Sequence, residues 1–489
     1  MSDLKKTVMT NWRWVMCAML FFATTVNYMD RQVLSLTFKE FIQPEFHWTD
    51  SDYGTITGVF SIAYAIFCLF AGKFIDWMGT KKGYLIAIIV WSLGAVMHAG
   101  CGWVTEQIVG VADKAALLEA TGAIVSTISM VSVWLFLVCR LILGLGEAGN
   151  FPAAIKVTAE YFPKKDRAFA TALFNAGASV GALAAPATIP LLAKSLGWEW
   201  AFIIIGALGF IWAGIWIFVY DKPTESQHVN EAELAYIHQD ETVVPDETGK
   251  TFEGKGAAEK QMSFLEAFKH KQTWSFAFGK FMTDGVWWFF LFWAPAYFQD
   301  QFGIKASDPQ GIALIFTLYA IVTVVSLFGG YLPKIFVEKK GMEPYAGRMR
   351  AMLIFAFFPI FALFAQPLGG IYGPWAVAII IGIVGAAHQS WSANIFSTTG
   401  DMFPKSAVAT ITGIGAMAGG VGSFLINKGS GMLFTHAEKM GDAFQFVGFS
   451  GKPAGYMIIF CICAVAYLIG WSVMKALVPK HEPVIVKED

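Results

Sequence analysis

The sequence predicts an all-α integral membrane protein with twelve transmembrane helices in two pseudo-symmetric bundles of six. Three observations predict this fold class. Of the 489 residues, 56% are hydrophobic and only 15% are charged, whereas a typical soluble domain carries about 25% charge. Apolar runs of about 20 residues, the length that crosses a bilayer as a helix, recur along nearly the whole chain. A hydrophilic stretch separates the first six runs from the last six.

The N-terminal six-helix bundle is predicted over residues 1–220. Its first apolar run ends in Asn27-Tyr28-Met29-Asp30-Arg31 and lacks the small-residue site at which a signal peptide is cleaved, so we expect it to remain as a span. A mildly acidic insertion, residues 105–121, precedes the fourth span. The six spans are expected at about 14–36, 53–77, 83–103, 126–160, 168–193 and 199–220.

A hydrophilic linker is predicted over residues 221–271. Within it, residues 230–234 are typical of a short capped surface helix, and residues 245–260 of a flexible segment. The C-terminal six-helix bundle and a short charged tail are predicted over residues 272–489. Its spans are expected near 273–298, 311–334, 351–367, 373–399, 406–434 and 454–478.

The distribution of lysine and arginine predicts the orientation, because short loops on the cytoplasmic side are enriched in these residues. One set of loops carries most of them, and the other set carries few. We therefore expect the basic side, the linker and both termini to be cytoplasmic, in a multi-pass protein of the cell inner membrane. The residues that decide this are Lys81, Lys82, Lys164, Lys165, Arg167, Lys339, Lys340, Arg348, Arg350 and Lys405.

Composition and motifs also exclude several classes of function. A net charge of −1 argues against nucleic acid as a partner. The six cysteines lie in apolar segments without CxxC spacing, and no nucleophile–base arrangement is present, so we expect no metal, no cofactor and no enzyme activity. Residues 144–149 match GxGxxG, but Pro152 follows and no alternating strands surround the motif. We expect the protein to be a monomer in the lipid bilayer.

Residues 140–167 organise the prediction of function. Arg140 and Glu147 are seven residues apart, close to two helical turns, and so lie on one helix face inside an apolar run. Shifting the sequence by 241 positions aligns residues 159–164 with 400–405 and places Glu147 opposite His388. Two related halves, each with an ionisable group in the same helix, are typical of secondary transporters. A repeat this short can also arise by chance, and the class prediction does not depend on it.

Several segments carry a resemblance to a known family. Residues 72–82, GKFIDWMGTKK, resemble the GxxxDRxGRR loop of the major facilitator superfamily, with Asp76 in place and Trp77 where the loop has arginine. NYMDR at 27–31 and residues 140–156 and 197–210 look like its anion:cation symporters. Residues 287–298 and 386–405 are most similar to bacterial hexuronate transporters. The resemblance implies the major facilitator fold and transport of an organic anion; Trp77 weakens the charge relay of the loop.

Arg31 is the predicted substrate ligand, because a buried charge in a membrane span is costly and marks a functional residue. Its planar guanidinium donates two parallel hydrogen bonds to a carboxylate, and Tyr28 lies three residues before it on the same face. The alternative is that Arg31 pairs with Asp30 or Glu147 and only holds helices together. The resemblance implies that this arginine binds the substrate carboxylate, that Asp30 takes the proton and that Tyr64 contacts the substrate.

Asp30 and Glu147 are the predicted proton-coupling residues. The proton affinity of a carboxyl group in a low dielectric depends on where the nearest cation lies. If Arg31 turns to the substrate, its former carboxylate partner loses compensation and should take up a proton. A permanent Arg31–Glu147 or Arg140–Glu147 bridge is the alternative. Arg140 is expected to orient Glu147 or to gate the site.

The second half supplies neutral polar candidates on the tenth span. Sugar hydroxyls need donors, acceptors and an aromatic platform, which this cluster contains. The alternative for its histidine is a satisfied bond between helices. In the seventh span, Lys280 and Asp284 are four residues apart and either act in gating or simply neutralise each other. The predicted substrate-binding cluster consists of His388, Gln389, Trp391, Ser392 and Asn394.

Together these features predict a proton-coupled symporter of an organic anion, with a hexuronate such as glucuronate or galacturonate favoured. The two bundles are expected to alternate access to a site near the midplane. The alternatives are an aldonate or another sugar-acid or carboxylate substrate, and coupling to sodium. A membrane sensor that binds the anion without transporting it is the alternative from a different class.

Overall fold

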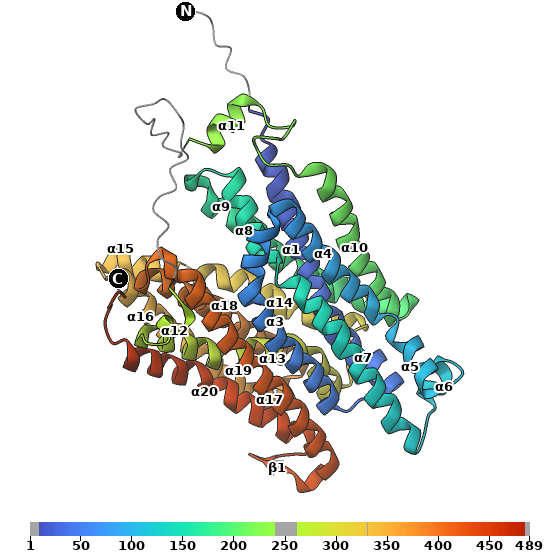
Figure 1. The fold of residues 1–489 in the computed structure, drawn as a ribbon. Helices are drawn as coiled ribbons and strands as arrows, with labels where there is room; N and C mark the ends of the chain where they lie inside the picture. Colours follow the sequence, from blue (N-terminus) through green and yellow to red (C-terminus); the bar gives the residue numbers. More distant parts are fainter. Residues whose placement is uncertain (1–8, 240–261, 330, 485–489) are drawn as a thin grey trace, which may run out of the picture.

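The computed structural model describes residues 9–239, 262–329 and 331–484, nearly all of them helical (Figure 1). The first half contains α1 (Trp12–Thr37), η1 (Phe38–Ile42), α2 (Gln43–Phe46), α3 (Asp50–Met78), α4 (Thr80–His98), α5 (Cys101–Val109), α6 (Lys114–Leu118), α7 (Ala123–Glu147), α8 (Asn150–Tyr161), α9 (Lys164–Leu196) and α10 (Trp198–Val219). The predicted insertion at 105–121 forms the end of α5 and α6. The predicted flexible segment at 245–260 lies outside the described residues.

The linker contributes α11 (Glu231–Ile237), and a short helix precedes the second bundle. The only strands in the described residues form a small antiparallel hairpin before the last helix. The remaining elements are α12 (Phe264–Ala267), α13 (Lys271–Phe302), α14 (Pro309–Gly329), α15 (Leu332–Lys340), α16 (Pro344–Phe357), η2 (Phe358–Phe364), α17 (Ala365–Tyr372), α18 (Pro374–Met402), α19 (Lys405–Met440), η3 (Gly441–Ala443), β1 (Gln445–Phe446), β2 (Phe449–Ser450) and α20 (Lys452–Leu477).

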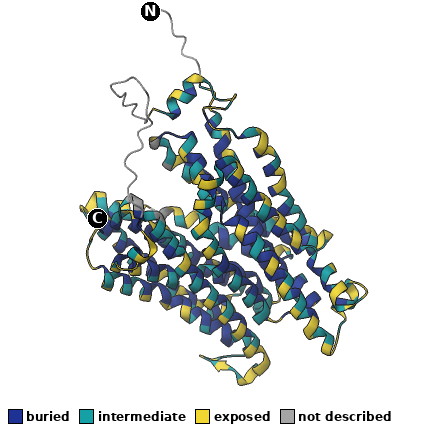
Figure 2. Ribbon diagram, viewed as in Figure 1, coloured by how far each residue is buried: buried dark blue, intermediate teal, exposed yellow. Residues whose placement is uncertain are grey.

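The predicted all-α membrane fold is confirmed. Ten helical segments of the described chain are long and apolar enough to cross a membrane. The other two predicted spans are α1 and α13, with 26 and 32 residues. Both have the length of a span, since about 20 residues suffice. They carry the buried charged residues Arg31 and Lys280, which lower their hydropathy. Figure 2 shows buried residues where helices pack together and exposed residues on their outward faces.

The predicted repeat marks the same junction in both halves. α8 ends at Tyr161 and α9 begins at Lys164, while α18 ends at Met402 and α19 begins at Lys405. The intervening phenylalanine is extended in both places, with φ and ψ of −124° and 135° at Phe162 and −123° and 148° at Phe403. Proline follows each phenylalanine and disfavours the helical conformation in the residue before it, so both helices end there.

The predicted fourth span is broken beside Glu147. α7 ends at Glu147 and α8 begins at Asn150. Pro152 lacks a backbone N–H and cannot bond the carbonyl of Ala148, so the helix cannot continue unbroken. The break places the Glu147 side chain at the end of a helix rather than in its middle.

The helix pairs that join the two halves include α3 with α19, α9 with α14, and α1 with α13. α3 and α19 approach closely, because a Cβ on Gly54 would lie 2.6 Å from the carbonyl oxygen of Asn427 and 3.0 Å from the Cα of Gly431. Small residues permit such close packing of membrane helices. In Figure 1 the first-half helices gather to the right and the second-half helices to the left, with α13 between them.

The linker helix α11 is docked on the start of α1, at the top of Figure 1. Asn230 caps α11 as predicted, since its side chain accepts a hydrogen bond from the N–H of Glu233. The Glu233 carboxylate is fully buried and accepts hydrogen bonds from the backbone N–H groups of Trp12 at 2.9 Å and Arg13 at 3.1 Å. It also pairs with the Arg13 guanidinium at 3.0 Å. This one carboxylate therefore satisfies the free N–H groups that begin α1.

The pKa of Glu233 lies below the ordinary value of a glutamate. Burial alone would raise this pKa, but the hydrogen bonds from Thr10, Arg13 and Trp12 together lower it by more than burial raises it. A lowered pKa in the docked state means that the charged carboxylate stabilises docking at pH values above about 4.3, the ordinary pKa of a glutamate. This stabilisation is lost as the pH falls through the lowered pKa.

We predict that Glu233→Gln loosens α11, because hydrogen bonds to a charged group stabilise by about 2 kcal/mol. The undocked population should rise about 30-fold. Amide hydrogen exchange of residues 226–239, followed by mass spectrometry, measures this change. Glu231→Gln, an exposed glutamate on the same helix, is the control and should leave exchange unchanged. Equal exchange in the two variants would contradict the docking role of Glu233.

Candidate functional site

The buried charged residues of α1 and α7 meet between the helices. The Arg31 guanidinium donates from Nη2 at 2.7 Å and from Nε at 3.1 Å to the same oxygen, Oε2 of Glu147. Arg31 is 5% exposed and Glu147 1% exposed. Of the pairings that the sequence left open, the structure therefore contains the Arg31–Glu147 bridge.

Three aromatic rings surround the Arg31 guanidinium. Its Cζ lies 5.4 Å from the ring centre of Tyr28, 4.6 Å from Tyr64 and 5.1 Å from Trp288. Such cation–π contacts hold a guanidinium in place without neutralising its charge. Trp288 belongs to α13, so the second half contributes one of the three rings that surround this residue of the first half. Sequence reasoning could not decide whether Trp288 faces the site or lipid.

Several polar atoms beside this pair are buried without a hydrogen-bond partner. They include both carboxyl oxygens of Asp30, Oε1 of Glu147, and both terminal nitrogens of Arg140. Both polar atoms of the Asn27 side chain, one turn before Arg31, are also buried without a hydrogen-bond partner. The Arg140 guanidinium instead lies 5.4 Å from the ring centre of Phe60. Since buried polar atoms are usually satisfied, this group is suited to accept a proton or a polar ligand.

The residues of the predicted polar cluster on α18 make different contacts. His388 Nδ1 lies 2.7 Å from the Tyr467 hydroxyl, and its ring stacks on Trp287 with centres 5.4 Å apart. The interhelical bond that the sequence left as an alternative is thus present. Trp391 is fully buried with its ring edge-on to Tyr467 at 5.5 Å.

The other predicted residues take varied positions. Gln389 and Ser392 are half-buried on α18, and Asn394 donates to the carbonyl of Ser390 in its own helix. Lys280 and Asp284 pair at 2.7 Å, Nζ to Oδ2. Asp76 is not part of this site, because its largely exposed carboxylate bonds Lys156 at 2.7 Å.

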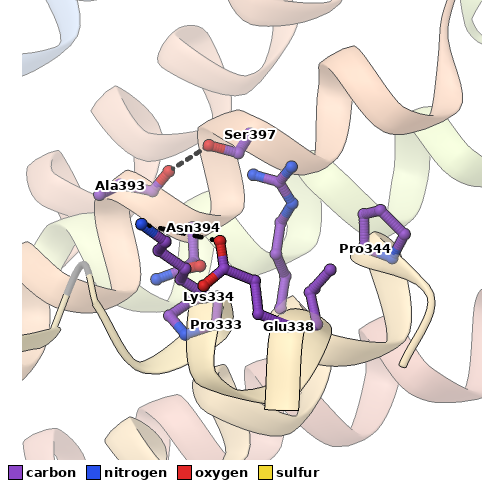
Figure 3. A pocket seen from close by; sticks show the side chains of 9 residues that line it. Pro333, Lys334, Glu338, Pro344, Ala393, Asn394 and Ser397 are labelled. Atoms are coloured by element: carbon purple, nitrogen blue, oxygen red, sulfur yellow. Dashed lines mark hydrogen bonds and ion pairs between the residues drawn. The ribbon is translucent and has the colours of Figure 1, made fainter. Parts of the chain in front are cut away.

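A separate cavity of about 370 Å³ lies between α15, α16 and α18 (Figure 3). Asn394 is the one predicted site residue in its lining, and Arg31 and Glu147 are not part of it. Its cations have carboxylate partners, Lys334 with Glu338 at 3.6 Å and Arg348 with Asp401 at 2.8 Å. The cavity therefore offers an anion no uncompensated charge. It is lined by Pro333, Lys334, Val337, Glu338, Pro344, Arg348, Ala393, Asn394 and Ser397.

A buried cluster of four charges joins the halves at the end opposite the linker. Lys39 lies 3.0 Å from both Asp50 and Asp300. Lys452 lies 2.5 Å from Asp50 and 2.9 Å from Asp300. The Tyr456 hydroxyl donates to Asp300 at 2.8 Å. We call these four charged residues the inter-half charge cluster. Sequence reasoning missed it, although all four residues lie at span ends predicted on the same side.

The same end carries further bonds between the halves. The Tyr53 hydroxyl donates to the carbonyl of Phe292 at 2.7 Å, and the Ser307 hydroxyl donates to Glu40 at 2.7 Å. In the part of the chain that the structure describes, every ion pair and side-chain hydrogen bond between the two helix bundles lies at this end. Polar bonds between the halves are thus confined to one end, whereas helix packing joins them elsewhere.

We predict that Asp300→Asn opens this end, since Lys39 and Lys452 then share a single carboxylate. Removing one partner of a buried ion pair costs about 3 kcal/mol or more. Because the charges are hydrated once the end opens, the ratio of closed to open protein should fall about 100-fold. Faster amide hydrogen exchange in η1 and in the β1–β2 hairpin measures the opening.

Glu438→Gln is the matched control for this prediction. Glu438 lies at the rim of the cluster, 3.8 Å from Lys452, and its side chain is 64% exposed. A rim charge contributes little because water screens it. If Asp300→Asn exchanges no faster than Glu438→Gln, the cluster does not hold the halves together.

Known proteins resemble this chain along nearly its whole length. The profile of the Major Facilitator Superfamily matches residues 20–426. A hexuronate transporter of Escherichia coli (strain K12) is 26% identical over 469 residues, 95% of this chain and 94% of that protein. A protein of the same strain named "probable galactarate/D-glucarate transporter" is 24% identical over 464 residues, 94% of this chain and 96% of that protein. The crystal structure of a bacterial homolog to the human lysosomal transporter Spinster superposes with a TM-score of 0.66 at 18% identity, covering 96% of this chain and 98% of that one.

Proposed function

Because the chain belongs to the Major Facilitator Superfamily, whose members are transporters, we propose that it is a proton-coupled symporter of a hexuronate such as glucuronate or galacturonate. It carries the anion across the cell inner membrane by alternating access. In this proposal the linker and both termini are cytoplasmic, as the loop lysines and arginines predict. The inter-half charge cluster then closes the outer side.

The observation that carries the proposal is the Arg31–Glu147 pair, whose arginine is surrounded by three aromatic side chains. A substrate carboxylate is a better bidentate partner for Arg31 than Glu147, which bonds it through one oxygen only. When the substrate takes Arg31, Glu147 loses its compensating cation inside a low dielectric. Taking up a proton removes that unpaired charge, so substrate binding and protonation support each other.

Asp30 is the second proton-coupling residue of the proposal. Both of its oxygens are buried without a hydrogen-bond partner, and an unpaired carboxylate in such a place is costly. The neutral, protonated form of Asp30 therefore costs less free energy in this place than the charged form. Arg140 orients Glu147 from the same helix, α7.

The second half holds the sugar ring in this proposal. Trp288 already contacts Arg31 across the interface, which supports a substrate site between α1 and α13. Tyr28 and Tyr64 shape the carboxylate end. His388, Gln389 and Ser392 of α18 supply donors and acceptors for the hydroxyls, whereas Trp391 is fully buried against Tyr467 and Asn394 lines the separate cavity, so these two support the site from behind. The hexuronate assignment is supported by the relative of that name, which matches nearly the whole chain.

Uptake of labelled glucuronate into proteoliposomes tests the proposal. A proton gradient, inside alkaline, should drive accumulation, and a sodium gradient of equal size should not. Uptake of an aldonate alone would keep the mechanism and change the substrate. Binding without accumulation under any gradient would contradict transport and favour a sensor.

A further inference from the structure

The Lys280–Asp284 pair on α13 is the starting observation. Nζ of Lys280 lies 2.7 Å from Oδ2 of Asp284, and the two side chains are 6% and 14% exposed. Nζ also lies 4.3 Å from the ring centre of Phe396 on α18. Asp284 rests against Gly419 of α19, where a Cβ would lie 2.2 Å from its Oδ2. Gly419 thus makes room for this carboxylate.

This pair lies on the face of α13 that reaches the candidate site. Residues four apart share a helix face, so Lys280, Asp284 and Trp288 follow one another along one side. Trp288 contacts the Arg31 guanidinium at 5.1 Å. The pair therefore begins one turn, about 6 Å, away from the residue that touches the carboxylate-binding arginine.

Lys280 is a cation placed where a second carboxylate could be bound. Within the described residues of the second half, it is the most deeply buried lysine or arginine. An extended six-carbon diacid separates its carboxylate carbons by about 6 Å, the length of five C–C bonds in a zigzag. That span equals one helical turn along α13. A diacid held by Arg31, beside Trp288, would extend its far carboxylate along this face of α13 toward Asp284, with Lys280 one turn beyond.

We infer that Asp284 is a specificity residue that occupies Lys280 and excludes sugar acids with two carboxylates, an inference that rests on the proposed function. With Asp284 in place, the pair has no net charge and a second substrate carboxylate meets a carboxylate of the protein. A hexuronate has one carboxylate and presents only hydroxyls to this region. The carrier therefore selects acids with a single carboxylate.

Asp284→Asn tests this inference, because it removes the charge and keeps the shape. Proteoliposomes take up labelled glucuronate in competition with unlabelled glucarate, a six-carbon sugar diacid. In the unaltered protein, glucarate should inhibit at least tenfold more weakly than glucuronate. In Asp284→Asn, Lys280 has lost its carboxylate partner. Inhibition by glucarate should therefore strengthen at least tenfold relative to inhibition by glucuronate.

The double variant Lys280→Gln, Asp284→Asn is the matched control. It keeps polar side chains of similar length without either charge, so inhibition by glucarate should not strengthen relative to that by glucuronate. An equal gain in the single and double variants would show a loss of packing and overturn the inference. Unaltered protein that accepts glucarate as well as glucuronate would overturn it without any variant.

A direct binding measurement separates the two proposals. Thermal stabilisation of the purified unaltered protein by glucuronate requires no transport. If neither acid binds or is taken up, the proposed function fails. If glucuronate binds and is accumulated but Asp284→Asn leaves the ratio of the two acids unchanged, only the role of Asp284 fails.

Discussion

Arg31→Ala is expected to abolish glucuronate uptake, with a fall of at least 100-fold. In the described residues, the Arg31 guanidinium is the one cation that contacts the three rings of Tyr28, Tyr64 and Trp288. Two charged hydrogen bonds to the substrate depend on it. Each such bond contributes about 1.5–3 kcal/mol, so losing both corresponds to 100-fold or more in binding. Arg31→Lys keeps the charge but cannot form parallel bonds, and uptake should still fall about tenfold. Initial uptake rates in proteoliposomes measure both effects.

Arg350→Lys is the control for these variants, because Arg350 is exposed on α16 and lies apart from the site. Equal amounts of folded protein in the membrane establish that loss of uptake is not loss of protein. Wild-type affinity in Arg31→Ala would support the alternative in which Arg31 only bridges α1 and α7. In that case the variant should be unstable yet still bind glucuronate.

Glu147→Gln is expected to uncouple transport from the proton gradient. Glutamine still accepts a hydrogen bond from Arg31 but neither binds nor releases a proton, so the coupling step is lost. Accumulation against a concentration gradient should fall to the passive level. Exchange of labelled for unlabelled glucuronate across the membrane should persist, since it needs binding and alternation without net proton movement.

The comparison of net accumulation with exchange makes this prediction specific. A variant that had merely lost its structure would lose both activities together. Glu106→Gln, a partly exposed glutamate of α5, serves as the matched control and should keep both. Retained gradient-driven accumulation in Glu147→Gln would show that the coupling proton is carried elsewhere, with Asp30→Asn as the next variant to measure.

The bilayer explains why so much of the fold could be predicted from the sequence. A span must be a continuous apolar helix of about 20 residues, so composition alone marks it. The same constraint made Asp30, Arg31 and Glu147 conspicuous, because charge in a span is costly. The two spans with the weakest hydropathy, α1 and α13, are the helices that carry Arg31 and Lys280. The resemblance to hexuronate transporters, seen in short motifs, is confirmed by the relative matched over 95% of the chain.

The candidate site could be predicted residue by residue but not as an arrangement. Asp30 is the neighbour of Arg31 in sequence, yet the partner of Arg31 is Glu147, 116 positions away. Adjacent residues on a helix point about 100° apart, whereas packing of α1 on α7 brings their facing side chains together. The place of Trp288 beside Arg31 and the bond of His388 to Tyr467 likewise depend on packing between helices.

The sequence by itself determined the membrane class, the number of spans and the residue types available for an anion and a proton, because each follows from local composition in a bilayer. Only the tertiary structure decided which charges pair. It determined the Arg31–Glu147 bridge, and it assembled Lys39, Asp50, Asp300 and Lys452 from four separate elements. Pairing depends on distances of a few ångströms between helices, and no pattern along one chain fixes those distances.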